Sequence, residues 1–178
     1  MLPEFRYHPD PLNTGSVITS NAECRCCGKR RGYIYTGPVY AEADLDEALC
    51  PWCIADGSAH RTFDARFVDR EAFPPDVPPS TTAEISERTP GYDTWQREEW
   101  PACCGDAAAF LGPAGIVDIR KNSPELEGSL LGHIIYNMGI SGGAATRLLE
   151  SLDREAGPTA YFFRCLGCGE YKFHIDRP

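Results

Sequence analysis

The 178-residue sequence has no apolar run approaching the roughly 18 residues that a membrane-spanning helix requires. Its first residues, MLPEFR, also lack the basic leader and the apolar segment of a secretion signal. We therefore expect a cytoplasmic protein with no membrane partner. A reducing cytoplasm disfavours a framework of disulfide bonds as the source of stability.

Positive charge is also scarce. The chain carries 17 Lys and Arg against 26 Asp and Glu, which gives a net charge of −9. Because proteins that bind the nucleic-acid backbone need a basic surface, nucleic acid is not expected as a partner. An acidic surface instead favours solubility, or attracts a basic protein partner.

Motifs that carry enzyme chemistry are missing as well. The four histidines lie in no catalytic pattern, and Gly142-Gly143 lacks the Lys-Ser/Thr that completes a phosphate-binding loop. The sequence has no nucleophile elbow of the G-x-S-x-G type. We therefore predict no catalytic residues.

Cysteine, in contrast, is abundant. Nine cysteines in a cytoplasmic chain indicate metal binding rather than disulfides. The pairs Cys24-x2-Cys27 and Cys50-x2-Cys53 are separated by 22 residues, and two such pairs supply the tetrahedral four-sulfur shell that Zn²⁺ prefers. We predict a zinc site here, called site one. Cys26, inside the first pair, is taken as the unpaired ninth thiol.

The residues around site one predict the local fold. Residues 31–35 are rich in strand formers, Thr36-Gly37-Pro38 predicts a turn, and Val39-Tyr40 resumes an extended run, which together indicate a hairpin. Cys50 is expected to open a short helix that ends near Gly57. A knuckle, a hairpin and a helix that begins with a Cys-x2-Cys pair make a treble-clef or zinc-ribbon-like arrangement.

A second cluster, called site two, is predicted from Cys165-x2-Cys168-Gly169, which repeats the form of Cys24-x2-Cys27-Gly28. Its partners are Cys103 and Cys104, although adjacent cysteines impose a strained geometry on one ion. His174 or Asp106 is an alternative fourth ligand. The number of zinc ions is therefore one or two. Iron in a rubredoxin-like shell, or reduced buried thiols without metal, are the competing interpretations of the cysteines.

The rest of the chain predicts an α+β fold. A zinc-stabilised lobe at residues 1–73 is followed by a proline-rich connector at 74–80. A mixed helix–hairpin lobe at 81–178 carries the second knuckle, and the two lobes can also form one integrated domain. Thr159–Arg164 and Tyr171–Ile175 are expected to pair as a hairpin, and Trp95–Trp100 is expected to form a short helix.

Five segments closely resemble the CbrC-like bacterial family: residues 5–11 (FRYHPDP), 31–40 (RGYIYTGPVY), 50–59 (CPWCIADGSA), 95–112 and 163–169 (FRCLGCG). The family pattern has His-Cys at the positions of Cys103 and Cys104, which implies a ligand role for position 103. It often has cysteine at the position of Ala108, which implies that a ligand there is dispensable. The resemblance further implies tolerance of a nuclease colicin, or immunity to a secreted toxin.

Three functions follow as hypotheses. The first is a non-enzymatic zinc protein that confers tolerance or immunity by binding a basic toxin domain. The second is an enzyme of unknown reaction, with a polar cleft between the lobes and with Asp106 and Arg120 as residues to test. The third, which the charge disfavours, is a zinc-ribbon module for nucleic acid.

Overall fold

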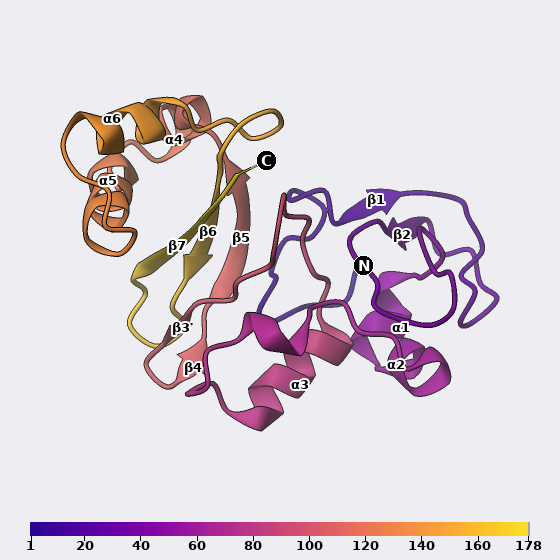
Figure 1. The fold of residues 1–178 in the computed structure, drawn as a ribbon. Coiled ribbons are helices and arrows are strands. Elements are labelled where there is room, and N and C mark those ends of the chain that lie inside the picture. The colour runs from indigo at the N-terminus through magenta and orange to yellow at the C-terminus, as the bar shows by residue number, and fades with distance from the viewer. Residues whose placement is uncertain (178) are drawn as a thin grey trace.

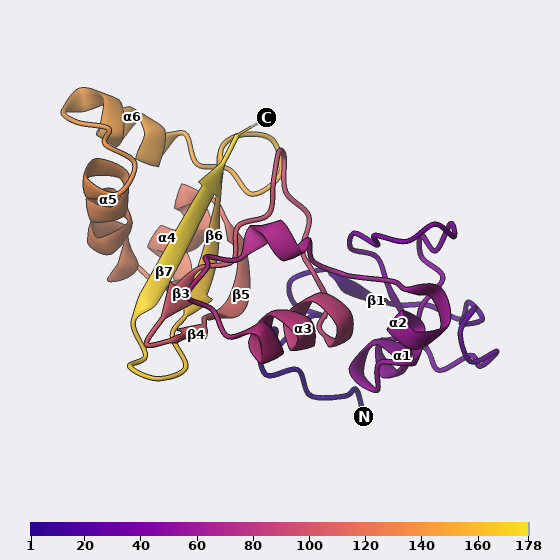
Figure 2. The same cartoon turned by 60° about the horizontal axis from the view of Figure 1, so that its bottom comes forward.

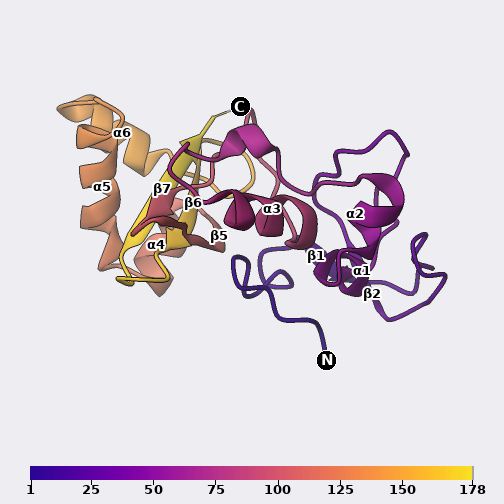
Figure 3. The ribbon, with the colours of Figure 1, turned by 90° about the horizontal axis from the view of Figure 1, so that it is seen from below.

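A computed structural model describes residues 1–177 of the chain. The elements are spread along one direction (Figures 1 and 3). The N-terminal strands and short helices lie at one end, and the helices within residues 116–150 lie at the other. Helix α3 (Pro79–Arg88) and a three-stranded sheet stand between them. No helix in residues 1–177 is long and apolar enough to cross a membrane.

The N-terminal end is built on a two-stranded antiparallel ladder. Strand β1 (Val17–Thr19) pairs with β2 (Tyr33–Tyr35), with Val17 opposite Tyr35. The predicted hairpin over residues 31–40 is therefore wrong in its pairing. The partner of β2 precedes the first cysteine pair, and Tyr40 forms an isolated bridge with Arg66 instead.

Two short helices follow. Helix α1 (Pro51–Ala55) begins directly after Cys50, as the sequence predicted, because Pro51 is favoured in the first turn, where no backbone donor is needed. Gly57 then takes a left-handed conformation, with φ of +73°, and leads into α2 (Ser58–Phe63).

The middle of the chain forms a 3₁₀ turn (Arg70–Ala72) and helix α3 (Pro79–Arg88). Between them, the proline-rich segment contributes Val77 to a buried cluster that includes Trp100 and Phe110. The division into lobes at 1–73 and 81–178 stays a prediction, and Pro178 lies outside the described residues. The predicted helix at Trp95–Trp100 is wrong, because these residues follow an irregular path.

The sheet at the centre has the order β5-β6-β7 and is antiparallel throughout. Its strands are β5 (Ala109–Ala114), β6 (Thr159–Arg164) and β7 (Tyr171–Asp176). The pairing of β6 with β7 confirms the predicted hairpin, with Phe162 opposite Phe173. Just before β5, the strands β3 (Ala102–Cys103) and β4 (Asp106–Ala107) form a minimal hairpin.

Helices α4 (Ile116–Asn122), α5 (Leu126–Tyr136) and α6 (Gly143–Glu150) are inserted between β5 and β6. They cover one side of the sheet, and α3 lies on the other (Figure 2). Leu130, Ile134 and Leu149 from these helices are buried against Phe162 and Phe173 of the sheet. The observed architecture is thus mixed α+β, with small antiparallel sheets.

Candidate metal centres

Site one is assembled from three neighbouring pieces of the N-terminal end. The β1–β2 ladder is extended by a hydrogen bond from the Ser20 N–H to the Gly32 carbonyl, and the loop beyond it carries Cys24 and Cys27. The segment leading to α1 runs beside this loop, because the Arg25 N–H donates to the Ala48 carbonyl. Cys50 is the residue that caps α1, and Cys53 lies in the first turn of that helix.

The loop around Cys24 closes as a knuckle. The Gly28 N–H donates to the Cys24 carbonyl at 2.7 Å, and the Cys24 N–H donates to the Lys29 carbonyl at 3.0 Å. Gly28 adopts a φ of +65°, which favours glycine. The sulfur of Cys24 also accepts a hydrogen bond from the Cys50 N–H at 3.2 Å, so the knuckle and the helix start are joined at the site.

The four sulfurs have the spacing of a tetrahedral metal shell. A zinc ion with Zn–S bonds of about 2.3 Å places neighbouring sulfurs about 3.8 Å apart. The Sγ–Sγ distances are 3.8 Å for Cys24–Cys53, 3.9 Å for Cys27–Cys50 and 3.6 Å for Cys50–Cys53. All four sulfurs lie within 4.8 Å of one another, so the geometry fits one ion.

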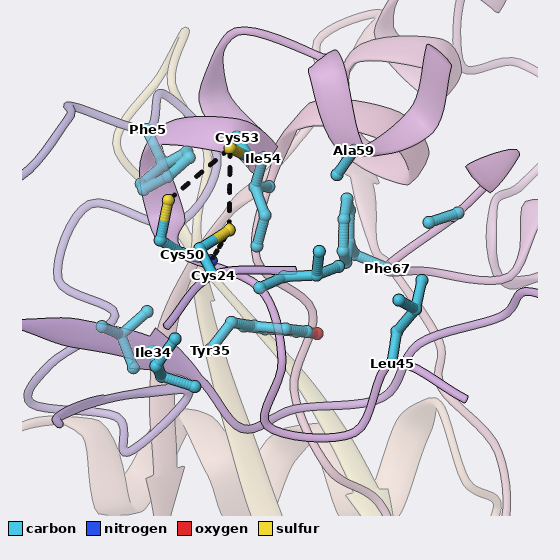
Figure 4. Packing of buried hydrophobic residues seen from close by; sticks show 13 residues of the cluster. Phe5, Cys24, Ile34, Tyr35, Leu45, Cys50, Cys53, Ile54, Ala59 and Phe67 are labelled. Carbon is cyan, nitrogen blue, oxygen red and sulfur yellow. Dashed lines mark hydrogen bonds between the residues drawn. The ribbon is translucent and has the colours of Figure 1, made fainter. Parts of the chain in front are cut away.

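Site one is enclosed by the N-terminal core. Figure 4 shows the side chains of Cys24, Cys50 and Cys53 turned toward one another beside Phe5 and Ile54. These three cysteines are 0–2% exposed, and only Cys27 reaches the surface in part. Cys26 is outside the group and points to Ser58, with 3.5 Å between Sγ and Oγ.

Site two lies where two turns meet at one end of the central sheet (Figure 1). Cys103 ends β3, and the two residues between β3 and β4 are Cys104 and Gly105, with φ of +55° and +73°. Positive φ at both central residues is the mark of a type I′ hairpin turn. This turn resolves the strain expected of adjacent cysteine ligands, since it brings both sulfurs to the same cluster, 3.9 Å apart.

The other half of site two repeats the first knuckle in detail. The Gly169 N–H donates to the Cys165 carbonyl at 3.0 Å, and the Cys165 N–H donates to the Glu170 carbonyl at 2.8 Å. Gly169 has a φ of +78°, matching Gly28. The Sγ–Sγ distance from Cys103 to Cys168 is 3.6 Å, and the four sulfurs again lie within 4.8 Å of one another. Cys104 and Cys168 are exposed, unlike the ligand candidates of site one.

Neither alternative fourth ligand lies in site two. Asp106 accepts hydrogen bonds from the hydroxyls of Tyr7 and Thr81, and pairs with Arg6 at 2.7 Å. His174 faces Glu99, with 3.3 Å between Nδ1 and Oε2. Both side chains therefore serve contacts between elements of the fold.

Charge repulsion among thiolates limits how many of them ionise without a cation. In site one, the pKa of Cys24 is lowered to about 4, first by the hydrogen bond from the Cys50 thiol, while burial raises the pKa of Cys53 to about 12. In site two, the Cys168 N–H lowers the pKa of Cys165 to about 6. The pKa of Cys103 is raised to about 12 by its hydrogen bond to Cys165. Metal binding must therefore release protons from both clusters.

The residues considered for catalysis do not come together. Arg120 of α4 forms ion pairs with Glu127 of α5 and Glu150 of α6 and so links the three helices. Asp106 accepts hydrogen bonds from Tyr7 and Thr81 instead. A cavity of about 280 Å³ was not foreseen from the sequence. It is lined by residues from several segments that are distant in the chain, among them Thr14, Asp93 and Arg154. No local motif joins these residues, so no signal in the sequence pointed to them.

Comparison with known proteins gives a single consistent result. The model of an uncharacterised protein family, UPF0167, matches residues 2–177. UPF0167 proteins of Mycobacterium bovis and Mycobacterium tuberculosis are each 48% identical over 176 residues, covering 98% of this chain and 93% of the relative. A UPF0167 protein of Pseudomonas aeruginosa is 41% identical over 177 residues, covering 98% of this chain and 97% of the relative. No solved structure matches the chain.

Proposed function

The chain belongs to the UPF0167 family, and on that premise we propose that it is a non-enzymatic protein with two structural zinc ions that acts by binding a basic protein partner. The observation that carries the metal part is the spacing of the sulfurs. Each of two separate sets of four cysteines contains Sγ–Sγ pairs 3.6–3.9 Å apart, the spacing of a tetrahedral shell, and all four sulfurs of each set lie within 4.8 Å of one another.

Zinc is the ion that this donor set favours. Four thiolates in a tetrahedron suit Zn²⁺ or iron, and zinc is the usual occupant of paired Cys-x2-Cys knuckles. Hydrogen bonds from backbone N–H groups to Cys24 and Cys165 also stabilise thiolates. The knuckle and the helix start of site one are treble-clef-like, and we include that relationship in the proposal.

A structural role follows from the closed shells. Catalytic zinc keeps one position open for water or substrate, usually beside histidine or carboxylate ligands. Four cysteines leave no such position in either cluster. The ions therefore contribute to folding, and the action of the protein is assigned to its surface.

The support for a basic partner is electrostatic. A groove of about 470 Å³ is formed by residues 36–39 and 41–46 together with Asp93. Its exposed rim carries Glu42, Asp44 and Asp46, and no Lys or Arg lines it. Acidic surfaces of this kind steer basic partners toward themselves. The resemblance to the CbrC-like family implies that this partner is a toxin domain, and we adopt it as the partner to test.

The metal part is tested by elemental analysis of the purified protein. We expect two equivalents of zinc per chain and no stoichiometric iron. Replacing Cys26 with serine should leave both equivalents in place, whereas Cys53→Ser should remove one. Protein that folds with no bound metal would overturn this part of the proposal.

The partner part is tested separately. The protein should retain a basic toxin domain encoded beside its gene in a pull-down, and deleting the gene should raise sensitivity to that toxin. The triple variant E42K/D44K/D46K should weaken binding. The control variant D76K/E125K/E155K changes the net charge by the same amount at exposed acidic residues elsewhere, and it should bind as the parent does. Absence of any captured partner, with unchanged sensitivity after deletion, rejects toxin binding but leaves the zinc result standing.

A further inference from the structure

The cavity of about 280 Å³ lies outside both cysteine clusters and outside the acidic rim proposed for partner binding. Its walls come from the N-terminal turn at residues 14–16, the irregular segment 92–95, strands β5 and β6, and the loop before β6. Its volume is just below the range of about 300–1,000 Å³ that drug-sized ligands fill. A small metabolite is therefore the size of ligand to consider.

The floor of the cavity is aromatic and firmly held. The buried rings of Tyr92 and Phe110 stack with centroids 4.3 Å apart, and Tyr161 lies 5.1 Å from Tyr92. The Tyr92 hydroxyl donates to the Glu99 carbonyl at 2.7 Å. A rigid aromatic floor binds the apolar body of a ligand at a low cost in conformational entropy.

A buried histidine fixes the wall that adjoins this floor. The edge of the His8 ring packs on Phe110, with centroids 4.9 Å apart. Its two nitrogens are 2.8 Å from the Pro90 carbonyl oxygen and 2.7 Å from the Thr14 hydroxyl. The N-terminal turn is thereby tied to the chain just before Tyr92, so the cavity is a preformed feature of the fold.

Two opposite charges stand at the rim. Asp93 and Arg154 both line the cavity, and within residues 1–177 neither forms an ion pair. The only side-chain hydrogen bond of Arg154 among those residues is a long one, 3.5 Å from Nη2 to the Asn13 carbonyl. Trp95 supplies a further wall, held by its indole N–H, which donates to the Thr159 hydroxyl at 3.0 Å.

We propose that this cavity binds a free α-amino acid with an apolar side chain. The Arg154 guanidinium holds the carboxylate, Asp93 holds the ammonium group, and the side chain lies on Tyr92, Phe110 and Tyr161. A guanidinium is suited to a carboxylate because it offers two parallel donors, and the ammonium group also gains from the nearby aromatic faces. The inference goes beyond the proposed function, because it assigns a small-molecule ligand to a separate cavity that shares only Asp93 with the groove proposed for the basic partner.

The experiment is isothermal titration calorimetry of the zinc-loaded full-length protein. L-Phenylalanine is compared with phenethylamine, which lacks the carboxylate, and with 3-phenylpropionate, which lacks the ammonium group. The proposal predicts that each truncated analogue binds at least about tenfold more weakly than the amino acid, since each loses one charge-assisted contact. The other common amino acids, titrated in the same way, define the preferred side chain.

Two substitutions assign the contacts. Arg154→Gln should weaken the binding of L-phenylalanine about tenfold and leave the binding of phenethylamine unchanged. Asp93→Asn should also weaken the binding of L-phenylalanine about tenfold, but it should leave the binding of 3-phenylpropionate unchanged. Arg147→Gln, an exposed arginine on α6 that does not line the cavity, is the control and should alter none of these affinities. Melting temperatures close to that of the parent protein show that the variants are folded.

The proposal is overturned by either of two results. One is the absence of binding by every common amino acid up to about 10 mM, a concentration at which even a weak site is occupied. The other is binding that is the same in Arg154→Gln, Asp93→Asn and the parent. Neither result bears on the metal content, so failure here is distinguishable from failure of the proposed function.

Discussion

The two cysteine clusters use the same knuckle in opposite surroundings. In site one, Cys24, Cys50 and Cys53 are buried among Phe5, Ile54 and other core residues. In site two, Cys104 and Cys168 are exposed, and the cluster joins two turns at one end of the sheet. The first knuckle faces a helix start, whereas the second faces a hairpin turn. The same ligand set thus forms part of a hydrophobic core at one site and clamps two surface turns at the other.

The largest expected effect comes from breaking the buried cluster. On the proposed function, Cys50→Ser should remove one zinc equivalent and lower the free energy of unfolding by more than about 5 kcal/mol, because the N-terminal core packs around these cysteines and metal binding there would contribute to folding. Thermal unfolding followed by circular dichroism, with zinc analysis, measures this. Cys26→Ser is the matched control and should lose neither zinc nor stability.

The exposed cluster should respond less. On the same proposal, Cys168→Ser should also remove one zinc equivalent, yet lower the free energy of unfolding by only a few kcal/mol, because Cys104 and Cys168 are exposed rather than packed in a hydrophobic core. The N-terminal core and its zinc should persist. If Cys168→Ser destabilises the protein as much as Cys50→Ser does, the contrast between the sites is wrong.

A smaller effect tests the turn that supports site two. Gly105 has a φ of +73°, so Gly105→Ala should cost about 1–2 kcal/mol although the space beside it is open. Gly128→Ala is the control, since Gly128 lies within α5 with open space beside it. That change should be neutral or stabilising in the same chemical denaturation experiment.

The smallest effect is a pH dependence of stability that arises from a buried carboxyl group and not from the cysteine clusters. Glu98 is 4% exposed, and its Oε1 has no hydrogen-bond partner within residues 1–177. Burial raises its pKa from 4.5 to about 7, so the folded protein binds a proton that the unfolded chain releases. This stabilisation is complete below pH 4.5 and is lost as the pH rises through about 7.

Between pH 6 and pH 8 the free energy of unfolding of the parent protein should therefore fall by about 1 kcal/mol because of Glu98. Glu98→Gln should lack that component and keep two zinc equivalents. Denaturant unfolding at several pH values measures the difference. An identical pH dependence in the parent and the variant would remove Glu98 from the explanation.

The sequence predicted best what depends on local contacts. Cys-x2-Cys-Gly fixed the form of both knuckles, and the run from Thr159 to Arg164 is apolar enough to be a strand in any context. The alternation in Tyr171–Ile175 likewise placed its return strand. In each case the residues that determine the structure are neighbours in the chain.

The errors involved distant contacts. Tyr33–Tyr35 pairs with a three-residue strand whose sequence, in a turn-rich region, gave little indication of a strand. The segment around Trp95 and Trp100 is held out of a helix by tertiary hydrogen bonds. The Gln96 N–H donates to Asp176, and the Trp100 indole donates to the Ala108 carbonyl. The left-handed backbone conformation of Cys104 was also not predicted, because a positive φ is uncommon in residues other than glycine.

The spacing of the cysteines along the chain also sets the order in which the clusters can be completed during synthesis. Cys24 and Cys53 are 29 residues apart, whereas Cys103 and Cys168 are 65 apart with three helices between them. All four cysteines of site one are present once Cys53 has been made, and the short loop between them closes at low entropic cost. Site two is complete only once Cys168 has been made. A chain released between those two points would have every cysteine of site one and would lack a cysteine of site two.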